Sequence, residues 1–290
     1  MSLLEVKNIS YSYSKGTPFE KKAITDVSFS VEKGEFIGII GHTGSGKSTM
    51  MQMLDGLLKP DSGSVFLEGK DINSDKKITR EARFKVGLCF QYPEYQLFEE
   101  TVAKDIAFGP RNMGLSENEI KQRVVKAASF VNLDNSLLDR SPFDLSGGQK
   151  RRAAIAGVMA MLPEILILDE PAAGLDPVGR KEILSMISEY RRSTGATVMM
   201  VTHSMETAAL VSDRIFVLHH GSLAFTGTPK EVFSHADELI SMGLDVPVST
   251  KIVAELRKNG IDIPSDVYTV ERCAEVLSEY VRKKRSGEVK

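Results

Sequence analysis

The chain has 290 residues, of which 42% are hydrophobic and 26% are charged, close to the usage of soluble globular proteins. Its formal net charge of −2 provides no basic field that would hold nucleic acid or anionic lipid. The longest apolar runs are far shorter than the ~20 residues of a membrane-spanning helix, and the first residues do not resemble a secretory signal, so we expect a cytosolic chain.

The first thirty residues favour an antiparallel, half-exposed sheet, because residues 3–9 mix apolar and polar side chains and residues 27–31 alternate. Later strands are short continuous apolar runs, most of them separated by helical stretches, which is typical of parallel strands covered on both faces. These runs lie at residues 35–40, 86–90, 165–168, 197–201 and 214–218. The fold class predicted from this pattern is α/β.

Two helical regions accompany the sheet. Between about residues 101 and 162 the strand signal disappears, and a capping box at 116–119 begins a helix, which predicts a helical insertion. After about residue 234 two helical patterns follow, and the second has an apolar stripe that needs a partner surface: Val270, Cys273, Ala274, Leu277 and Val281. We therefore expect a domain at 1–233, with a helical subdomain at about 92–162, and a helical extension at 234–290.

Cysteines and basic residues add little to this picture. Cys89 and Cys273 lie in apolar contexts without ligand spacing, so we expect buried thiols. The basic run at 282–285 is expected to be solvated, the alternative being a binding patch.

A glycine-rich loop, Gly-His-Thr-Gly-Ser-Gly-Lys-Ser at residues 41–48, lies between a predicted strand and a predicted helix. Such a loop points backbone N–H groups at phosphate oxygens, and the helix N-terminus adds about half a positive charge there. Lys47 would reach the β- and γ-phosphates of ATP, and Ser48 would hold Mg²⁺. The nucleotide-binding residues predicted here are Gly41, His42, Thr43, Gly44, Ser45, Gly46, Lys47, Ser48 and Thr49, although the His42 side chain itself is given no chemistry.

The apolar run at 165–168 ends in two carboxylates, Asp169 and Glu170. Ligands of parallel sheets bind at the carboxyl ends of strands. Asp169 would orient Mg²⁺, whereas Glu170 would polarise the attacking water as a general base. By themselves the two carboxylates could equally cap a helix, and the glycine loop in the same chain favours the catalytic interpretation.

The pentapeptide Leu-Ser-Gly-Gly-Gln at 145–149 opens a predicted helix that runs to about residue 162. Alone it is a helix start capped by Ser146. Together with the preceding motifs it resembles the ATP-binding-cassette (ABC) superfamily. This resemblance implies a P-loop NTPase (RecA-like) core with an antiparallel β subdomain, a helical signature subdomain and a small α-helical C-terminal extension. It also implies a head-to-tail dimer in which the partner's nucleotide is contacted by Ser146, Gly147, Gly148 and Gln149.

Other positions match motifs of the same superfamily. Tyr13 matches the aromatic residue on which adenine stacks, with Tyr11 as the rival. Gln91 matches the glutamine that senses Mg²⁺ and water, and Asp176 belongs to the loop that communicates across the dimer. His203 matches the switch histidine that contacts the γ-phosphate. The resemblance thus implies Glu170, His203 and Gln91 as catalytic residues and Ser48, Gln91 and Asp169 as Mg²⁺ ligands, whereas His219, His220 and His235 are expected at the surface.

Three stretches, at 16–20, 90–102 and 105–110, look like the second ATPase of energy-coupling-factor (ECF) importers, which take up vitamins and transition-metal ions. This narrower resemblance implies a peripheral protein on the cytoplasmic face of the membrane. The implied partners are a second ABC ATPase subunit, identical or paralogous, a transmembrane scaffold subunit and a substrate-binding membrane subunit. The extension would keep the two ATPases paired, and no nucleic acid is expected.

In that family the segment after the glutamine lines a groove for helices of the scaffold subunit. Here the segment is acidic, which would suit basic helices or would form a solvated face: Glu94, Glu99, Glu100 and Asp105. Three other functions stay open at this point: the ATPase of a different ABC importer, a non-transport ABC ATPase, and a scaffold that binds nucleotide without hydrolysing it.

Overall fold

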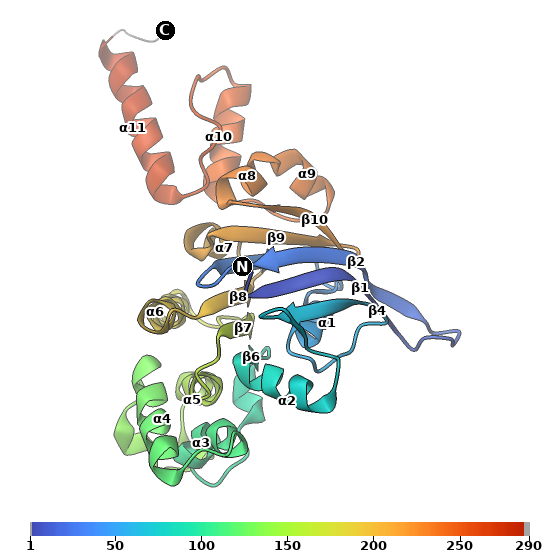
Figure 1. The fold of residues 1–290 in the computed structure, drawn as a ribbon. Coiled ribbons are helices and arrows are strands. Elements are labelled where there is room, and N and C mark those ends of the chain that lie inside the picture. Colours follow the sequence, from blue (N-terminus) through green and yellow to red (C-terminus); the bar gives the residue numbers. More distant parts are fainter. Residues whose placement is uncertain (1, 287–290) are drawn as a thin grey trace.

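The computed structural model describes residues 2–286 and confirms an α/β fold with two sheets (Figure 1). The larger sheet has six strands in the order β10-β9-β3-β8-β7-β6, all parallel except β10, which pairs antiparallel with β9. Its central strands are fully buried, as their continuous apolar sequences predict. The strands are β3 (Phe36–Ile40), β6 (Val86–Cys89), β7 (Ile165–Asp169), β8 (Thr197–Val201), β9 (Arg214–His219) and β10 (Ser222–Gly227).

The smaller sheet has four antiparallel strands in the order β2-β1-β4-β5. Its first two strands are longer than the stretches 3–9 and 27–31 from which they were predicted. The last two strands were not predicted at all. The strands are β1 (Leu4–Tyr13), β2 (Lys21–Val31), β4 (Ser62–Leu67) and β5 (Lys70–Asp71).

The helices surround the larger sheet and form the tail (Figure 1). The predicted capping box is present at Ser116 and Glu119, at the start of α4. Within residues 2–286 no helix combines the length and apolarity that crossing a bilayer requires. The helices are α1 (Lys47–Leu54), α2 (Lys76–Lys85), α3 (Val102–Asn112), α4 (Glu117–Phe130), α5 (Gly147–Met159), α6 (Pro177–Thr194), α7 (Met205–Val211), α8 (Pro229–Ser234), α9 (Ala236–Ser241), α10 (Val248–Lys258) and α11 (Val270–Ser286), with short 3₁₀ turns η1 (Pro93–Gln96), η2 (Asn135–Leu137) and η3 (Pro142–Asp144).

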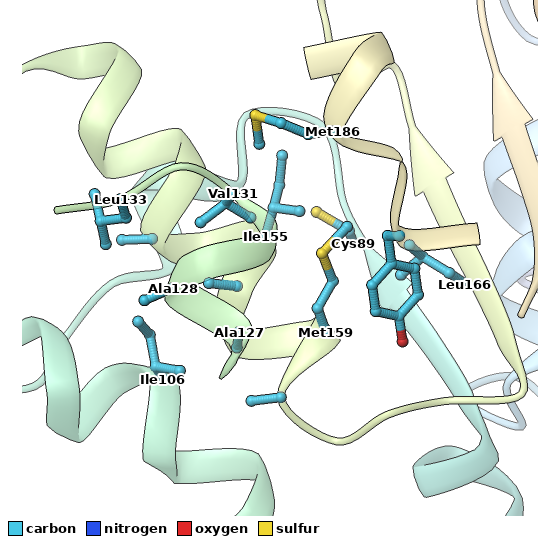
Figure 2. Close-up of a cluster of buried hydrophobic side chains, with 14 of the residues drawn as sticks. Cys89, Ile106, Ala127, Ala128, Val131, Leu133, Ile155, Met159, Leu166 and Met186 are labelled. Atoms are coloured by element: carbon cyan, nitrogen blue, oxygen red, sulfur yellow. The ribbon is translucent and has the colours of Figure 1, made fainter. Parts of the chain in front are cut away.

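The larger sheet buries a different core on each face, because neighbouring side chains of a strand point to opposite sides. From β7, Ile165 and Ile167 join a core that includes α1 and the smaller sheet. Leu166 and Leu168 join a second core with residues of α3, α4, α5 and α6, part of which Figure 2 shows. The helical insertion therefore packs in one continuous core with the sheet.

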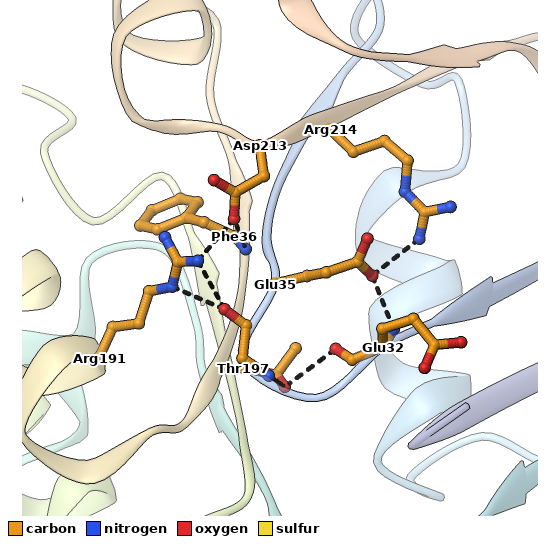
Figure 3. Close-up of polar contacts among 8 residues, drawn as sticks. Glu32, Glu35, Phe36, Arg191, Thr197, Asp213 and Arg214 are labelled. Carbon is orange, nitrogen blue, oxygen red and sulfur yellow. Dashed lines mark hydrogen bonds and ion pairs between the residues drawn. The ribbon is translucent and has the colours of Figure 1, made fainter. Parts of the chain in front are cut away.

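A polar network fixes the amino ends of β3, β8 and β9 (Figure 3). Arg191 of α6 donates to the carbonyl of Gly34 at 2.6 and 2.8 Å and pairs with Asp213 at 2.6 Å. Asp213 also accepts from the N–H of Phe36, and the Thr197 hydroxyl accepts from the N–H of Gly34. These bonds lock the strands at one end of the sheet, so that their opposite, carboxyl ends are held in register.

The helices after β10, α8 to α11, pack in two separate units. Residues of α8 and α9 and the following turn, including Phe233 and Leu244, pack in a core with Ile40 of β3. A separate small core joins α10 to α11 and buries Cys273; Cys89 is also buried, as expected. The expected boundary at residue 234 stays a prediction, and from this packing we propose that the extension begins near Pro247. The basic run at 282–285 is exposed at the end of α11.

Asp55, directly after α1, is a buried carboxyl with an unusual proton affinity. Only 5% of the residue is exposed. Burial raises its pKa to about 7, even though it accepts a hydrogen bond from the N–H of Leu57 and lies near Arg83. The folded state thus keeps this proton to a higher pH than the unfolded chain, and the contribution of Asp55 to stability falls as pH rises from ~4 to ~7.

We expect Asp55→Asn to match the parent in stability near pH 4 and to exceed it by roughly 2 to 4 kcal/mol above pH 7, because the amide keeps the acceptor without the buried charge. Urea unfolding at a series of pH values measures the difference. The control is Asp61→Asn, since the Ser12 N–H and Lys15 hold the pKa of the exposed Asp61 below its usual range. If the difference in free energy of unfolding between Asp55→Asn and the parent stayed constant from about pH 4 to above pH 7, the raised pKa of Asp55 would be contradicted.

Candidate active site

The predicted motifs follow four neighbouring parallel strands, β3, β8, β7 and β6. The register pairs Val201 of β8 with both Ile39 of β3 and Asp169 of β7, and Cys89 of β6 with Leu168. The carboxyl ends of these strands therefore lie at one edge of the sheet. The glycine loop, Gln91, Glu170 and His203 each follow one of these ends.

A pocket of about 270 Å³ opens at this edge. It brings together eleven of the predicted site residues, from five different segments of the chain. Two further residues at the start of β2, Lys21 and Ala23, line the pocket and were not predicted, because only the pairing of Tyr13 with Lys21 places them there. The lining consists of Tyr13, Lys21, Ala23, Thr43, Gly44, Gly46, Lys47, Ser48, Thr49, Gln91, Asp169, Glu170 and His203.

The glycine loop depends on Gly46, which caps α1 with φ of 102°. A Cβ there would lie 2.5 Å from the carbonyl oxygen of Ala23, so only glycine fits. The next residue, Lys47, is buried, and its ammonium donates to the carbonyls of Gly41 at 2.6 Å and His42 at 2.9 Å. Burial lowers the Lys47 pKa, against the opposing effect of the Glu170 and Asp169 charges.

Oxygen ligands meet beside the loop. The Ser48 hydroxyl donates to Oδ2 of Asp169 at 2.8 Å, and Gln91 lines the same pocket. Hydroxyl, carboxylate and amide oxygens are the hard donors that Mg²⁺ accepts, so these residues fit the ion in donor chemistry.

Glu170 and His203 form the second polar pair of the pocket, with Nε2 of His203 2.9 Å from Oε1 of Glu170. Glu170 has a left-handed backbone (φ 50°), held by its N–H bond to the carbonyl of Val201 at 3.1 Å. Such strain in a non-glycine residue persists only where the surroundings enforce it, and it is concentrated at functional sites. The carboxylate is therefore presented in a fixed direction, with an imidazole that can orient it.

The aromatic wall of the pocket is Tyr13. Its hydroxyl lies 3.1 Å from Oγ1 of Thr49, and its ring meets Tyr11 edge to face at 5.0 Å. Tyr11 itself packs against the core between the two sheets and does not belong to the pocket lining. The geometry favours Tyr13 over its rival.

The signature segment and Asp176 are not brought to this pocket. Ser146 caps α5, forming a reciprocal capping box with Gln149, as its interpretation as a helix start predicted. Gly147 and Gly148 are exposed, and a Cβ on either would meet nothing within 4 Å. Asp176 caps α6 by accepting from a backbone N–H in its first turn at 2.7 Å. Any nucleotide contact of these residues must therefore be made outside the pocket of their own chain.

Of the histidines expected at the surface, His220 is exposed and His219 is half-buried. His42 lies outside the pocket lining, and its ring contacts the rings of both. These contacts were missed because the fold alone brings the turn between β9 and β10 against the glycine loop. His235 does lie at the surface, where it pairs with Glu238.

A buried ion pair that the sequence did not suggest joins three parts of the site. Arg151 of α5 binds Glu94 at 2.6 and 3.0 Å and donates to the carbonyl of Ala173 at 2.6 Å. The two side chains are only 5% and 14% exposed. Although burial raises the Glu94 pKa, the hydrogen bonds and charge of Arg151 hold it below its usual range. The pair connects the signature helix to the segment after Gln91 and to the loop after Glu170.

Comparison with known proteins agrees with this geometry. The profile of a family described as "ABC transporter" matches residues 24–173. The chain is 52% identical over 279 residues to "Energy-coupling factor transporter ATP-binding protein EcfA2" of Caldanaerobacter subterraneus subsp. tengcongensis, covering 96% of this chain and 98% of the relative. It is 54% identical over 269 residues to the protein of the same name from Clostridium acetobutylicum, covering 92% and 94%.

Solved structures resemble it as well. One is cbiO1 from Clostridium perfringens, described as part of the ABC transporter complex cbiONQ, with a TM-score of 0.73, 39% identity and coverage of 83% of this chain and 94% of that one. Another is a dimeric post-hydrolysis state of the ATP-binding cassette MJ0796 with ADP and Pi, with a TM-score of 0.70, 28% identity and coverage of 78% and 98%.

We expect Arg151→Met to lower the free energy of unfolding by about 3 to 5 kcal/mol, because it leaves the Glu94 carboxylate buried without its partner. Arg192→Met is the matched control, since Arg192 pairs with Glu189 at the exposed surface and should contribute less than about 1 kcal/mol. Denaturant unfolding of the three purified chains tests this. If both variants lost the same free energy of unfolding, the buried Arg151–Glu94 pair would stabilise the fold no more than an exposed pair does.

Proposed function

This chain belongs to the ABC transporter family of ATPases, and from that premise we propose that it is the ATP-hydrolysing subunit of an ECF-type importer for a micronutrient, a vitamin or a transition-metal ion. The observation that carries the proposal is the pocket at the edge of the larger sheet, where the glycine loop, the Ser48–Asp169 pair and the Glu170–His203 pair meet. Extensive identity to ECF transporter subunits supports the narrower assignment.

In the proposed reaction the glycine loop and Lys47 bind the phosphates of ATP. Backbone N–H groups at the start of α1 and the Lys47 ammonium supply the positive charge. Tyr13 stacks on the adenine. These contacts position the γ-phosphate in front of Glu170, so that binding energy is used for orientation.

Glu170 then accepts a proton from the water that attacks the γ-phosphorus. Its contact with Nε2 of His203 at 2.9 Å helps to orient the carboxylate, and His203 itself is half exposed and lines the pocket, where it can reach a γ-phosphate oxygen. Ser48, Asp169 and Gln91 would hold Mg²⁺, which neutralises phosphate charge when it is bound.

We further propose that the site is completed by a second ABC ATPase subunit. Gly147 and Gly148 occupy the first turn of α5, where glycine is a weaker helix former than alanine, yet no atom within residues 2–286 needs their small size. Exposed glycines at a helix N-terminus allow the phosphates of a neighbour's nucleotide to approach closely. The narrower resemblance favours a paralogous ATPase over an identical copy.

An apolar groove is the proposed docking site for a helix of the transmembrane scaffold, which would hold the chain on the cytoplasmic face of the membrane. The groove has a volume of about 420 Å³ and lies between α2, α3, α5 and the segment after Gln91. Its mouth carries the edge-to-face pair Phe98 and Phe108, both exposed. Exposed aromatic residues at a groove are typical anchors for an apolar helix.

The acidic residues in the segment after Gln91 are less available to basic helices of a partner than the sequence suggested. Glu94 is paired with Arg151, and Asp105 accepts from the backbone N–H groups of Phe98 and Glu99. Glu100, just before α3, pairs with Lys104 in its first turn. Most of the negative charge is thus engaged inside the chain, and the apolar lining becomes the main attraction for a partner helix.

The extension is proposed to keep the paired ATPases together. In α11, Cys273 and Val276 face the small core with α10, whereas Val270 and Val281 are exposed. The outward apolar positions leave α11 with a face that a second subunit can cover.

We expect Glu170→Gln to keep ATP affinity and to lose at least about 100-fold in hydrolysis, because an amide cannot accept the proton of the attacking water. Phosphate release by the complex of the chain with its partner ATPase and calorimetry of ATP binding to the full-length chain measure the two quantities. Lys47→Ala is the contrasting variant, which should lose ATP affinity itself. Hydrolysis near the parent rate in Glu170→Gln would reject the base, and a parent without phosphate release would favour the non-hydrolysing scaffold.

For the docking groove we expect Phe108→Glu to prevent recovery of membrane subunits with the affinity-tagged chain, because a charge then faces the apolar lining. Val125→Glu is the matched control, since Phe108 and Val125 are 44% and 49% exposed and Val125 lies on α4 outside the groove. ATP binding should persist in both variants. Equal recovery of membrane subunits from all three chains would mean that the partner binds elsewhere.

A further inference from the structure

Three imidazoles meet at the glycine loop. His42 comes from the loop itself, His219 is the last residue of β9, and His220 begins the turn to β10. One ligand nitrogen of each ring lies within 4.8 Å of the other two. No other group of three such residues meets this criterion within residues 2–286.

Two of the ring nitrogens are buried without a hydrogen-bond partner in the described chain, Nε2 of His42 and Nδ1 of His219. Unsatisfied buried polar atoms are rare in folded proteins, and each calls for an occupant. The other nitrogen of His42, Nδ1, lies 2.7 Å from the carbonyl oxygen of Thr43. A ring N–H bonded to a backbone carbonyl leaves the lone pair of the opposite nitrogen free, which is the usual arrangement of a metal-binding histidine.

The backbone around the three rings is fixed. The N–H of Gly221 donates to the carbonyl of Ser45 in the loop at 3.0 Å, and the carbonyl of Gly221 accepts from Thr25 at 2.8 Å. A Cβ at Gly41 would lie 2.4 Å from the carbonyl oxygen of Leu218, so the loop and the end of β9 are in close contact. The histidines are therefore held together by the fold rather than by a chance choice of side-chain conformations.

We propose that His42, His219 and His220 form a binding site for a divalent transition-metal ion of the zinc or nickel kind. Neutral imidazole prefers such ions, whereas Mg²⁺ and Ca²⁺ prefer oxygen ligands. Three histidines with one open position are an established zinc coordination. Zinc–nitrogen bonds of about 2.0 to 2.1 Å require the nitrogens to be about 3.4 Å apart, so the rings would have to turn toward the ion on binding.

Packing alone is the competing explanation, because His219 and His220 lie edge to face with centroids 4.1 Å apart. Packing of neutral rings would leave both buried nitrogens unsatisfied, whereas a metal ion satisfies both. The lining of the nucleotide pocket excludes all three histidines. The proposed metal site does not depend on which solute the proposed importer carries.

The test is calorimetric titration of Zn²⁺ into the full-length chain, freed of metal by a chelator. We expect one ion per chain for the parent and an affinity at least about tenfold lower for His220→Gln. His220 is exposed, so this variant removes a ligand without opening the core. His235→Gln is the matched control, because it removes one exposed histidine from outside the cluster. The buried thiols do not compete, since burial raises the pKa of Cys89 to about 12 and Cys273 is enclosed.

Thermal unfolding gives a second readout. Because an ion that binds only the folded chain stabilises it, Zn²⁺ should raise the Tm of the parent and of His235→Gln more than that of His220→Gln. Equal Zn²⁺ affinity and an equal rise in Tm for His220→Gln and the parent would overturn the proposal. An equal loss of affinity in His220→Gln and His235→Gln would also overturn it, because binding would then be spread over surface histidines.

Discussion

The structure depends on one constraint, the parallel register of β3, β8, β7 and β6. The glycine loop, Gln91, Asp169, Glu170 and His203 lie at or just beyond the ends of these strands, so the register decides which of these groups meet. A slip of one residue in β7 would move Asp169 and Glu170 each by one position and turn the apolar side chains of the strand to the wrong faces. The two cores on either face and the Arg191 network at the amino ends oppose such a slip. The chemistry of the pocket is thus a consequence of how the sheet is packed.

The helical insertion is tied to the same edge through Arg151. Its guanidinium holds Glu94, close to the apolar groove, and the carbonyl of Ala173, close to Glu170. The insertion also shares a continuous core with the sheet. A partner that moved α3 and α5 would therefore pull on a buried ion pair and on packed side chains, both of which resist gradual deformation. This gives the proposed docking groove a contiguous physical connection to the proposed catalytic carboxylate.

Most of the larger sheet and most of the pocket could be predicted from the sequence, because continuous apolar runs mark buried strands and the glycine loop and strand-end carboxylates are local signals. Strands β4 and β10 were missed, since half-exposed strands with short or mixed sequences carry weak periodicity. Lys21, the Arg151–Glu94 pair and the histidine cluster were missed for a different reason. Each depends on segments far apart in the chain, whose meeting is decided by tertiary packing. The acidic segment after Gln91 misled in the opposite direction. Its carboxylates were expected to be available to a partner, but most of them are paired within the fold.

Three surfaces of the molecule have features that the chain itself does not use. The signature turn places two glycines where no atom of residues 2–286 lies near enough to need their small size, the groove exposes a pair of phenylalanines, and α11 exposes valines beside its small core. In an isolated chain the glycines cost helix stability, because glycine is a weak helix former. The exposed phenylalanines and valines cost solubility, because they leave apolar surface in water. The pocket, by contrast, gathers its charged groups on one open side without a residue of its own signature helix. Costs of this kind on separate faces are explained together if the chain is one part of a larger assembly, with a different neighbour for each face.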